Sequence, residues 1–331
     1  MISIIIPVYN GENFIGRAID SVIAQRGKWE LIIVNDHSTD NTQKILTEYA
    51  AGDKRIVIVD SQSKGVTDAR MAGAYKASGE YLFFMDADDE LPPDIIRETK
   101  RVVESDNTLD MVISDITEIC GNDTAQRSYG EKSFTNGREL FNWIIDQRTG
   151  FLWGKAIRKS LFLSLTYVPS TLKFCEDYVQ MLQLSIKAKR IKHVGKTGYI
   201  YYQNPTSACN TVKSRENYAD QFYKLAAAIK DLAKMSDFSG DEHEAGLLPA
   251  TRLKVMFLYY ARLYLAVMGG WSNDKDKLKC HYKEWMNNPA LLPDPLYDHR
   301  RRRQTKIAYY FPWLSAAFYV PVLKYKYHRI K

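Results

Sequence analysis

Short apolar segments alternate with amphipathic segments along the first hundred residues. Four segments rich in branched and aromatic side chains have the length of buried strands, and they lie at residues 2–10, 29–36, 55–60 and 80–86. Three segments between them, at residues 11–25, 38–50 and 65–78, carry apolar side chains at helical spacing, with Gly79 as a helix end. This alternation predicts an α/β fold with a mostly parallel, doubly wound sheet.

Polar side chains follow each of the four predicted strands. In strand order they are Tyr9 and Asn10, Asn35 and Asp36, Asp60, and Asp86 and Asp88. Ligands of open α/β sheets bind beyond the carboxyl ends of the strands, so these residues predict a binding site. No GxGxxG follows the first strand and no GxxxxGK[ST] occurs in the sequence, which disfavours a dinucleotide dehydrogenase and a P-loop nucleotidase.

The alternation becomes looser after about residue 100. Residues 110–119 and 198–204 have the composition of strands, and residues 137–147 and 176–191 have helical spacing. From about residue 214 the pattern is helical. We therefore place a domain boundary near residue 210, between an α/β domain at 1–210 and a helical C-terminal region at 211–331.

The segment FFMDADDE, at residues 83–90, places four acids directly after an apolar run. Two aspartates separated by one residue, such as Asp86 and Asp88, can hold a hard divalent cation on a loop. A solvated acidic turn before the next helix is the more common explanation of such residues, and Asp94, which follows two prolines, suits a helix start. The D-x-D pair alone leaves both interpretations open.

Other candidate residues also have two interpretations. The segment VNDHSTDNT, at 34–42, forms a polar turn unaided, or its acid binds a base or ribose. Tyr9 stacks on a base or packs in the core. Arg70 binds a phosphate or carboxylate, or lies on the surface. Glu176 and Asp177 open a helix, where its dipole stabilises them, or supply a general base.

Taken in order, five segments resemble the inverting, nucleotide-sugar-dependent glycosyltransferases of family two, which have the GT-A fold. They are SIIIPVYNGENFIGRAIDSVIAQ, ELIIVNDHSTDNT, GVTDARMAGAYKASGEYLFFMDADDE, LWGKAIRKSLF and CEDYVQML. The resemblance is close over residues 1–100, good at 151–180 and around 199–207, and fades after about 210. Enzymes of bacterial cell-surface polysaccharides are the nearest group. The resemblance implies a nucleotide-sugar half at about 1–100 and an acceptor half at about 101–210.

The resemblance also implies roles for residues of this sequence. The residues implied to bind the nucleotide sugar are Pro7, Tyr9, Asp36, Arg70 and Asp86. Asp88, with Asp86, is implied to hold Mg²⁺ or Mn²⁺. Asp177 is implied as the catalytic base with Glu176 beside it, and Trp153 and Lys155 are implied to line the acceptor side. The acidic pair follows KFC, which departs from the glycine-rich segment often found there.

These residue types suit the chemistry of sugar transfer. The leaving diphosphate gains negative charge that a cation neutralises, and the attacking hydroxyl loses a proton to a carboxylate. The resemblance therefore implies inverting transfer of a hexose or N-acetylhexosamine from a nucleoside-diphosphate sugar, a UDP-sugar by preference, to a glycan or lipid-linked glycan. The alternative is a binding or scaffold protein with the GT-A fold and no turnover.

The basic character of the chain lies in its last segment. Residues 300–331 contain nine Lys or Arg and no acid, so the rest of the chain has a net charge of −2 out of a total of +7. An uncharged, aromatic stretch at 307–323 between basic clusters predicts an interfacial segment on an anionic membrane. A re-entrant or spanning segment and a packed helix are alternatives, and Pro312 and Pro321 argue against one continuous helix. No nucleic-acid-binding motif accompanies the tail, so nucleic acid is not an expected partner.

Cysteine usage and the first residues bear on the compartment. Four widely spaced cysteines, without a CxxC pair, predict neither a zinc site nor a disulfide framework. The run MISIIIPVYN lacks the basic region and the cleavage site of a signal peptide, and it fits a strand. We therefore expect a cytoplasmic protein, peripheral on the inner face of the cell membrane.

Overall fold

The chain folds into two compact units, seen here in a computed structural model that describes residues 1–147, 149–167, 170–204, 215–235, 249–269, 274–286 and 299–328. The first unit comprises Met1–Ser170 and Gln180–Asn204, and the second comprises Thr171–Val179 and Pro205–Lys331. The predicted boundary near residue 210 lies within 205–214, outside the described residues. That boundary, like the division of the first 210 residues into two halves, stays a prediction.

The first half of the first unit contains every strand and helix that the alternating pattern predicts. Its strands are β1 (Ile2–Val8), β2 (Trp29–Asn35), β3 (Ile56–Asp60) and β4 (Tyr81–Phe84). The helices are α1 (Ile15–Ile23), α2 (Thr42–Gly52), α3 (Val66–Lys76) and α4 (Ile95–Ser105). The predicted helix end at Gly79 was wrong, because α3 ends at Lys76. Gly79 instead donates its N–H to Ser3 Oγ at 2.8 Å.

The second half of the unit is richer in strands than the sequence predicts. Its strands are β5 (Met111–Cys120), β6 (Asp123–Arg127), β7 (Glu131–Phe134), β8 (Lys155–Arg158) and β9 (Ile191–Tyr202). The helices are α5 (Gly137–Gln147), α6 (Lys159–Leu163) and α7 (Glu176–Lys187). Helix α7 begins in the second unit and continues in the first.

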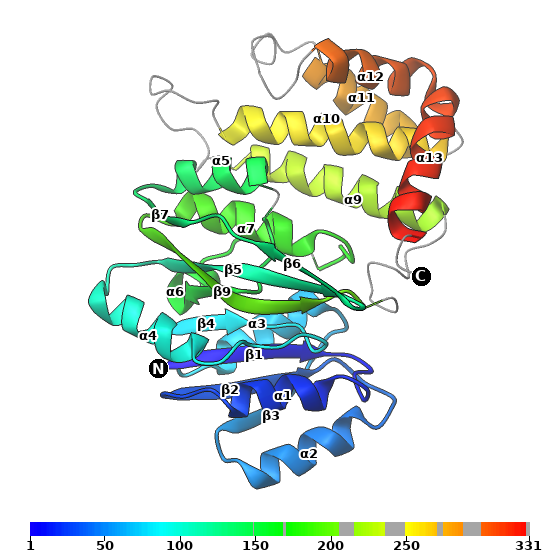
Figure 1. Ribbon diagram of the computed structural model, residues 1–331. Helices are drawn as coiled ribbons and strands as arrows, with labels where there is room; N and C mark the ends of the chain where they lie inside the picture. The colour runs from blue at the N-terminus through cyan, green and yellow to red at the C-terminus, as the bar shows by residue number, and fades with distance from the viewer. Residues whose placement is uncertain are drawn as a thin grey trace. The chain divides into compact units, whose positions relative to one another are not determined.

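One sheet joins all nine strands of the described residues (Figure 1). The strand order is β3-β2-β1-β4-β8-β5-β9-β7, and β6 pairs with β5. Strands β1 to β4 are parallel, β8 lies antiparallel between β4 and β5, and β9 is parallel to β5. Val8, Asn35 and Asp60 stand in register at the carboxyl ends of β1, β2 and β3. The polar residues that follow these strands therefore leave the sheet at one edge.

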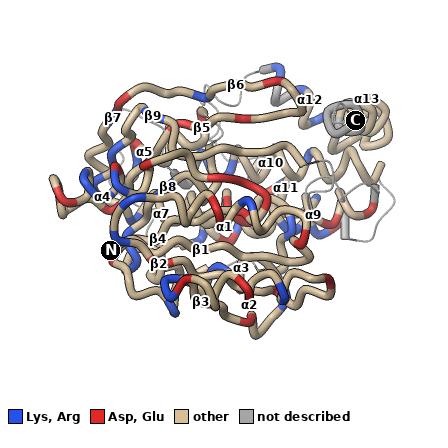
Figure 2. Tube along the Cα trace, turned by 60° about the horizontal axis from the view of Figure 1, so that its bottom comes forward, with Lys and Arg blue, Asp and Glu red and all other residues tan. Residues whose placement is uncertain are grey.

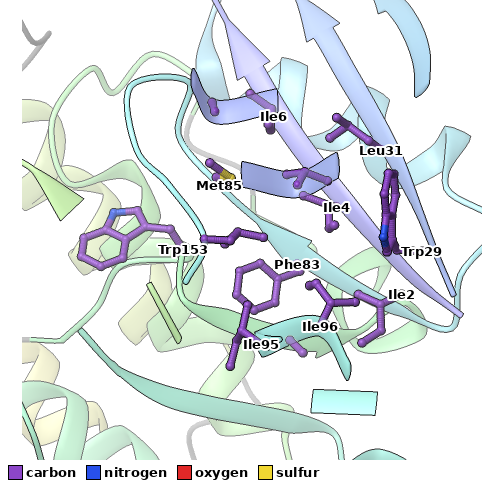
Figure 3. Packing of buried hydrophobic residues seen from close by; sticks show 14 of the residues in the cluster. Ile2, Ile4, Ile6, Trp29, Leu31, Phe83, Met85, Ile95, Ile96 and Trp153 are labelled. Carbon is purple, nitrogen blue, oxygen red and sulfur yellow. The ribbon is translucent and has the colours of Figure 1, made fainter. Parts of the chain in front are cut away.

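The core of the first unit lies on both faces of β1. Ile2, Ile4 and Ile6 point to one face, where Phe83 and Ile96 pack beside them (Figure 3). Ile5 points to the other face and is fully buried. Helix α3 approaches that face closely, since a Cβ atom at Gly73 would lie 2.5 Å from Ile5 Cγ2. This packing fixes α3 against the strands, which matters because α3 carries Arg70.

A buried histidine and aspartate link β9 to β5. His193 Nε2 lies 3.4 Å from Asp115 Oδ1, and both side chains are almost fully buried. Asp115 also accepts hydrogen bonds from Ser128 Oγ at 2.6 Å and from Tyr129 N–H at 3.0 Å. Burial lowers the pKa of His193, although the nearby Asp115 carboxylate acts in the opposite sense. Burial therefore disfavours the protonated, charged form of His193 inside the sheet.

The second unit is helical, as the sequence predicts. Its long helices are α9 (Arg215–Ala233), α10 (Pro249–Met268), α11 (Asp274–Met286), α12 (His299–Tyr310) and α13 (Pro312–His328). Helix α10 contacts each of the other four. Pro312 begins α13, as the expected break requires, but Pro321 lies inside α13, so the second expected break was wrong. Within the described residues, no helix combines the length and the apolar character that crossing a bilayer requires.

Candidate functional site

Asp36 fastens the start of α3 to the carboxyl end of β2. Its Oδ2 atom accepts a hydrogen bond from Gly65 N–H at 2.9 Å, and its own N–H donates to the Val8 carbonyl at 2.8 Å. Gly65 has φ of +135°, a conformation that a side chain disfavours. The other carboxylate oxygen, Oδ1, is buried and accepts no hydrogen bond within the described residues. A buried acceptor of this kind is costly unless a donor reaches it.

Arg70 brings a buried positive charge to the D-x-D loop. Its side chain is only 4% exposed, and its Nη2 atom lies 3.3 Å from Asp86 Oδ1, on a carboxylate that is 33% exposed. A buried guanidinium is costly unless it is paired, so this contact fixes both side chains. The structure therefore brings together Arg70 and Asp86, which the sequence analysis named separately.

The D-x-D loop is also fastened to β9 by a buried carboxylate. The Tyr199 hydroxyl accepts a hydrogen bond from Asp86 N–H at 2.9 Å and donates one to Asp89 Oδ2 at 2.6 Å. Asp89 Oδ1 accepts a further bond from Tyr202 N–H at 2.8 Å. Burial, together with the charges of Asp86 and Asp88, raises the pKa of Asp89 well above its ordinary value. Asp89 thus shapes the loop from inside the fold.

Asp88 is held from two further directions. Its carbonyl oxygen accepts a hydrogen bond from Arg17 Nη2 at 2.6 Å, and its Oδ2 atom accepts one from Asn204 Nδ2 at 3.2 Å. Arg17 also pairs with Glu90 at 2.8 Å and lies 3.9 Å above the Tyr202 ring. Arg17, Tyr199 and Asn204 were not among the residues predicted from the sequence. Their partners are distant in sequence, and no local pattern could have identified them.

Tyr9 is an exposed ring at the end of β1. It is 56% exposed, and the neighbouring Asn10 has φ of +50°. Asn10 N–H donates to Ser38 Oγ at 3.0 Å, and Asn10 Oδ1 accepts from Thr39 N–H at 2.8 Å. The loops after β1 and β2 are therefore joined beside the ring. Pro7 is buried within β1, and its implied contact with the nucleotide sugar stays a prediction.

Trp153 and Lys155 lie inside the first unit. The Trp153 ring stacks on Phe151 at 4.2 Å and on Tyr199 at 4.5 Å, measured between ring centroids. Lys155 is almost completely buried, and its Nζ atom donates to the Phe151 carbonyl at 2.6 Å. Trp153 thus supports the tyrosine that fastens the D-x-D loop. The implied position of both residues on the acceptor side stays a prediction.

Glu176 and Asp177 lie in the first turn of α7, and this turn belongs to the second unit. Cys175 precedes them with φ of +59°, so the chain turns sharply where the helix begins. Glu176 is buried, Asp177 is partly exposed, and Asp177 Oδ1 accepts a hydrogen bond from Tyr178 N–H at 2.7 Å. The role of Asp177 as a base, with Glu176 beside it, stays a prediction.

The residue types of the D-x-D loop fit a hard divalent cation. Mg²⁺ and Mn²⁺ prefer oxygen ligands, and Mg²⁺ commonly uses one or two protein carboxylates together with phosphate oxygens and water. The carboxylates of Asp86 and Asp88 meet that requirement. Within the described part of the chain, no group of three or more His, Cys, Asp or Glu could hold a metal ion. Phosphate oxygens and water would complete the coordination of a cation held by these two carboxylates.

Sequence comparison matches residues 3–163 to Glycosyl transferase family 2. The uncharacterized glycosyltransferase EpsJ of Bacillus subtilis is 29% identical over 221 residues, which are 62% of this chain and 62% of EpsJ. Glycosyltransferase GlyA of Streptococcus pneumoniae is 28% identical over 60% of this chain and 30% of GlyA. The poly(ribitol-phosphate) beta-glucosyltransferase of Bacillus spizizenii is 29% identical over 60% of this chain and 32% of that enzyme. The chain thus spans less than two thirds of the length of each of these relatives.

Solved structures share the fold over almost the whole chain. The S. aureus TarS 1–349 complex with UDP-GlcNAc has a TM-score of 0.67 at 18% identity, covering 97% of this chain and 91% of TarS 1–349. The mannosyltransferase PcManGT from Pyrobaculum calidifontis, in complex with GDP-Man and Mn²⁺, has a TM-score of 0.51 at 16% identity, covering 96% of this chain and 87% of PcManGT. The likeness confirms the predicted GT-A fold with its helical C-terminal region. The family match assigns residues 3–163 to glycosyl transferase family 2, and the solved structures show the fold.

Proposed function

We propose that the protein is an inverting glycosyltransferase that uses a nucleoside-diphosphate sugar, with UDP as the nucleotide. The observation that carries the proposal is the contact of buried Arg70 with Asp86, at the carboxyl end of β4. It places a guanidinium beside the D-x-D carboxylates, and a diphosphate with its cation needs both kinds of charge. The UDP-GlcNAc bound in TarS supports UDP as the nucleotide and a hexose or N-acetylhexosamine as the transferred sugar.

The donor is proposed to bind through residues at the ends of β1, β2 and β4. The exposed Tyr9 ring offers a flat surface on which the base stacks. Asp36 Oδ1, which accepts no hydrogen bond within the described residues, would accept one from an N–H of the base. Arg70 and Asp86 would face the diphosphate and ribose, with Pro7 beside them.

Asp88 and Asp86 are the proposed ligands of Mg²⁺ or Mn²⁺. A bound cation would neutralise charge on the leaving diphosphate. PcManGT was solved with Mn²⁺, which supports a divalent cation in this fold. The hydrogen bonds that hold Asp88 and Asp89 fix the loop before any ligand binds, so donor binding spends less free energy on ordering the loop.

The transfer step is proposed to use Asp177 as the general base. Its carboxylate removes the proton of an acceptor hydroxyl as the hydroxyl oxygen attacks the anomeric carbon of the sugar. The bond from that carbon to the diphosphate breaks, and the nucleoside diphosphate leaves with the electron pair. One direct attack inverts the anomeric centre. Glu176 is proposed to assist Asp177, and Trp153 and Lys155 to lie toward the acceptor.

The acceptor is proposed to be a glycan or a lipid-linked glycan of the cell surface. Two relatives support acceptors of this class by their names. One is the poly(ribitol-phosphate) beta-glucosyltransferase, and the other is the processive diacylglycerol beta-glycosyltransferase of Mycoplasma pneumoniae, 23% identical over 72% of this chain. A lipid-linked acceptor is held at the membrane, so we expect the enzyme on the cytoplasmic face of the cell membrane.

A nucleotide-release assay tests the proposal. The full-length protein is incubated with Mn²⁺ and a panel of UDP-, GDP- and dTDP-sugars, with and without short glycan and polyprenyl-phosphate-linked acceptors. We expect release of UDP from one donor, faster when the matching acceptor is present. Donor binding without release from any member of the panel would contradict the proposal and indicate a binding or scaffold protein instead.

A further inference from the structure

The outward face of α12 and α13 is strongly apolar. Six of the ten large, exposed apolar side chains of the described residues lie within residues 310–322: Tyr310, Phe311, Trp313, Leu314, Phe318 and Val322. Leu314, Phe318 and Val322 recur every four residues along α13 and share one side of that helix, while Tyr310 and Phe311 lie where α12 ends. Trp313 is 62% exposed and Phe318 is 70% exposed. We call this set of six side chains the aromatic face.

The buried positions of the same helices include polar side chains. Thr305 and Ser315 are almost fully buried. Arg262 of α10 is also buried, and its Nη1 atom donates to Gln304 Oε1 at 3.0 Å. The Tyr319 hydroxyl donates to the same oxygen at 3.3 Å. A helix that packs on a protein in water normally turns its large apolar side chains inward, so six exposed ones at α12 and α13 call for a partner surface.

Positive charge flanks the aromatic face. Arg303 and Lys306 are exposed on α12, and residues 300–331 carry nine Lys or Arg with no acid. Figure 2 accordingly shows no acidic residue along α13. Exposed rings between basic clusters fit the boundary between headgroups and acyl chains, where rings enter the apolar layer and basic residues meet anionic lipids.

Other occupants fit these observations less well. A second copy of the chain, related by a two-fold axis, would bring the positive charges of Arg303 and Lys306 together with the same charges of its partner. A soluble anionic polymer would explain the basic residues but would leave the exposed rings in water. An anionic bilayer satisfies both the rings and the charges.

We propose that the aromatic face, with Arg303 and Lys306, is a docking surface for an anionic lipid bilayer on which α13 lies in the plane of the interface. This surface goes beyond the transfer reaction, because it involves no residue of the D-x-D loop. It deepens the proposed function in one respect, since it would hold the enzyme where a lipid-linked acceptor resides. Its test needs neither a donor nor an acceptor.

Vesicle flotation of the full-length protein tests the surface. We expect binding to vesicles of phosphatidylglycerol and phosphatidylcholine in roughly equal parts, weak binding to pure phosphatidylcholine, and weakening by salt. Trp313→Gln/Phe318→Gln should lower partitioning by about tenfold or more. Arg303→Glu/Lys306→Glu should lower it by about 25-fold or more. Tyr75→Gln and Lys54→Glu remove an exposed ring and an exposed cation from other surfaces, and both should bind like the wild type.

Three results would overturn the proposal. The first is wild-type protein that does not float with the anionic vesicles. The second is that both double variants bind the anionic vesicles as well as Tyr75→Gln and Lys54→Glu do. The third is a dimer in analytical ultracentrifugation that Trp313→Gln/Phe318→Gln abolishes in a protein that ignores vesicles, which would make the face a contact between copies. Vesicle binding by a protein that releases no nucleotide would retain this surface and reject the proposed function.

Discussion

Removing one buried hydroxyl group tests how the D-x-D loop is held. Tyr199→Phe deletes the oxygen that accepts a hydrogen bond from Asp86 N–H at 2.9 Å and donates one to Asp89 Oδ2 at 2.6 Å. The side chain is completely buried and otherwise keeps its shape, including its stack on Trp153. The substitution therefore removes the link between the loop and β9 without opening a large cavity.

The magnitude follows from the two lost bonds. A net hydrogen bond contributes about 1 kcal/mol, and a buried acceptor left unsatisfied costs about 1–3 kcal/mol. Tyr199→Phe should therefore lower the free energy of unfolding by about 3 kcal/mol. If roughly half of that loss falls on the ligand-bound loop, the affinity for UDP in Mn²⁺ should drop about tenfold.

The assay pairs urea denaturation with calorimetric titration of UDP in Mn²⁺. Tyr81→Phe is the matched control, because Tyr81 is a buried residue at the opposite end of β4 whose hydroxyl donates to the Leu109 carbonyl at 2.6 Å. Both variants should lose stability, whereas only Tyr199→Phe should lose UDP affinity. Equal UDP affinity in the two variants would refute the role given to the Tyr199 hydroxyl.

Three further predictions concern other parts of the fold. Asp177→Asn should keep donor binding and lose transfer about a hundredfold or more, and normal transfer in the release assay would reject it as the base. Gly73→Ala should cost about 1–3 kcal/mol in urea, because its Cβ would lie 2.5 Å from Ile5 Cγ2, and an unchanged midpoint would contradict that contact. Burial lowers the pKa of His193, so the unfolded chain binds the proton more readily, and stability should fall as pH drops below about 6.5. His193→Gln should flatten this dependence in thermal melts, and parallel curves for the two proteins would count against it.

The alternating strands and helices of the first hundred residues were predictable because most of them carry a local signal in their own sequence. Branched residues in β1 and β2 and the helical spacing of apolar residues in α1 indicate their own structure. Strands β6 and β7 carry little signal, since most of their side chains are exposed and neither segment is apolar. The antiparallel insertion of β8 between β4 and β5 depends on distant pairing, which no short segment encodes.

The candidate site shows the same difference between residues with a local sequence signal and residues that depend on distant partners. Tyr9, Asp36, Arg70 and Asp86 could be named as candidates because they follow predicted strands or match a motif of the family. The fastening residues were missed because Asp89 and Tyr199 are separated by 110 positions, and a tyrosine in an apolar strand looks like an ordinary core residue. The helix break expected at Pro321 was wrong for a related reason. Its helix continues through the proline, because the packing of α13 on α10 outweighs the local penalty.

Titration of UDP into the full-length protein, in Mn²⁺ and in EDTA, tests the central claim most directly. That claim is that the loop after β4 binds a nucleoside diphosphate together with a divalent cation. We predict that wild-type protein binds UDP at least about tenfold more tightly in Mn²⁺ and that Asp88→Ala, confirmed to be folded, loses most of this difference. UDP binding that is absent in both buffers, or that is unaffected by Mn²⁺ in both proteins, would contradict the claim.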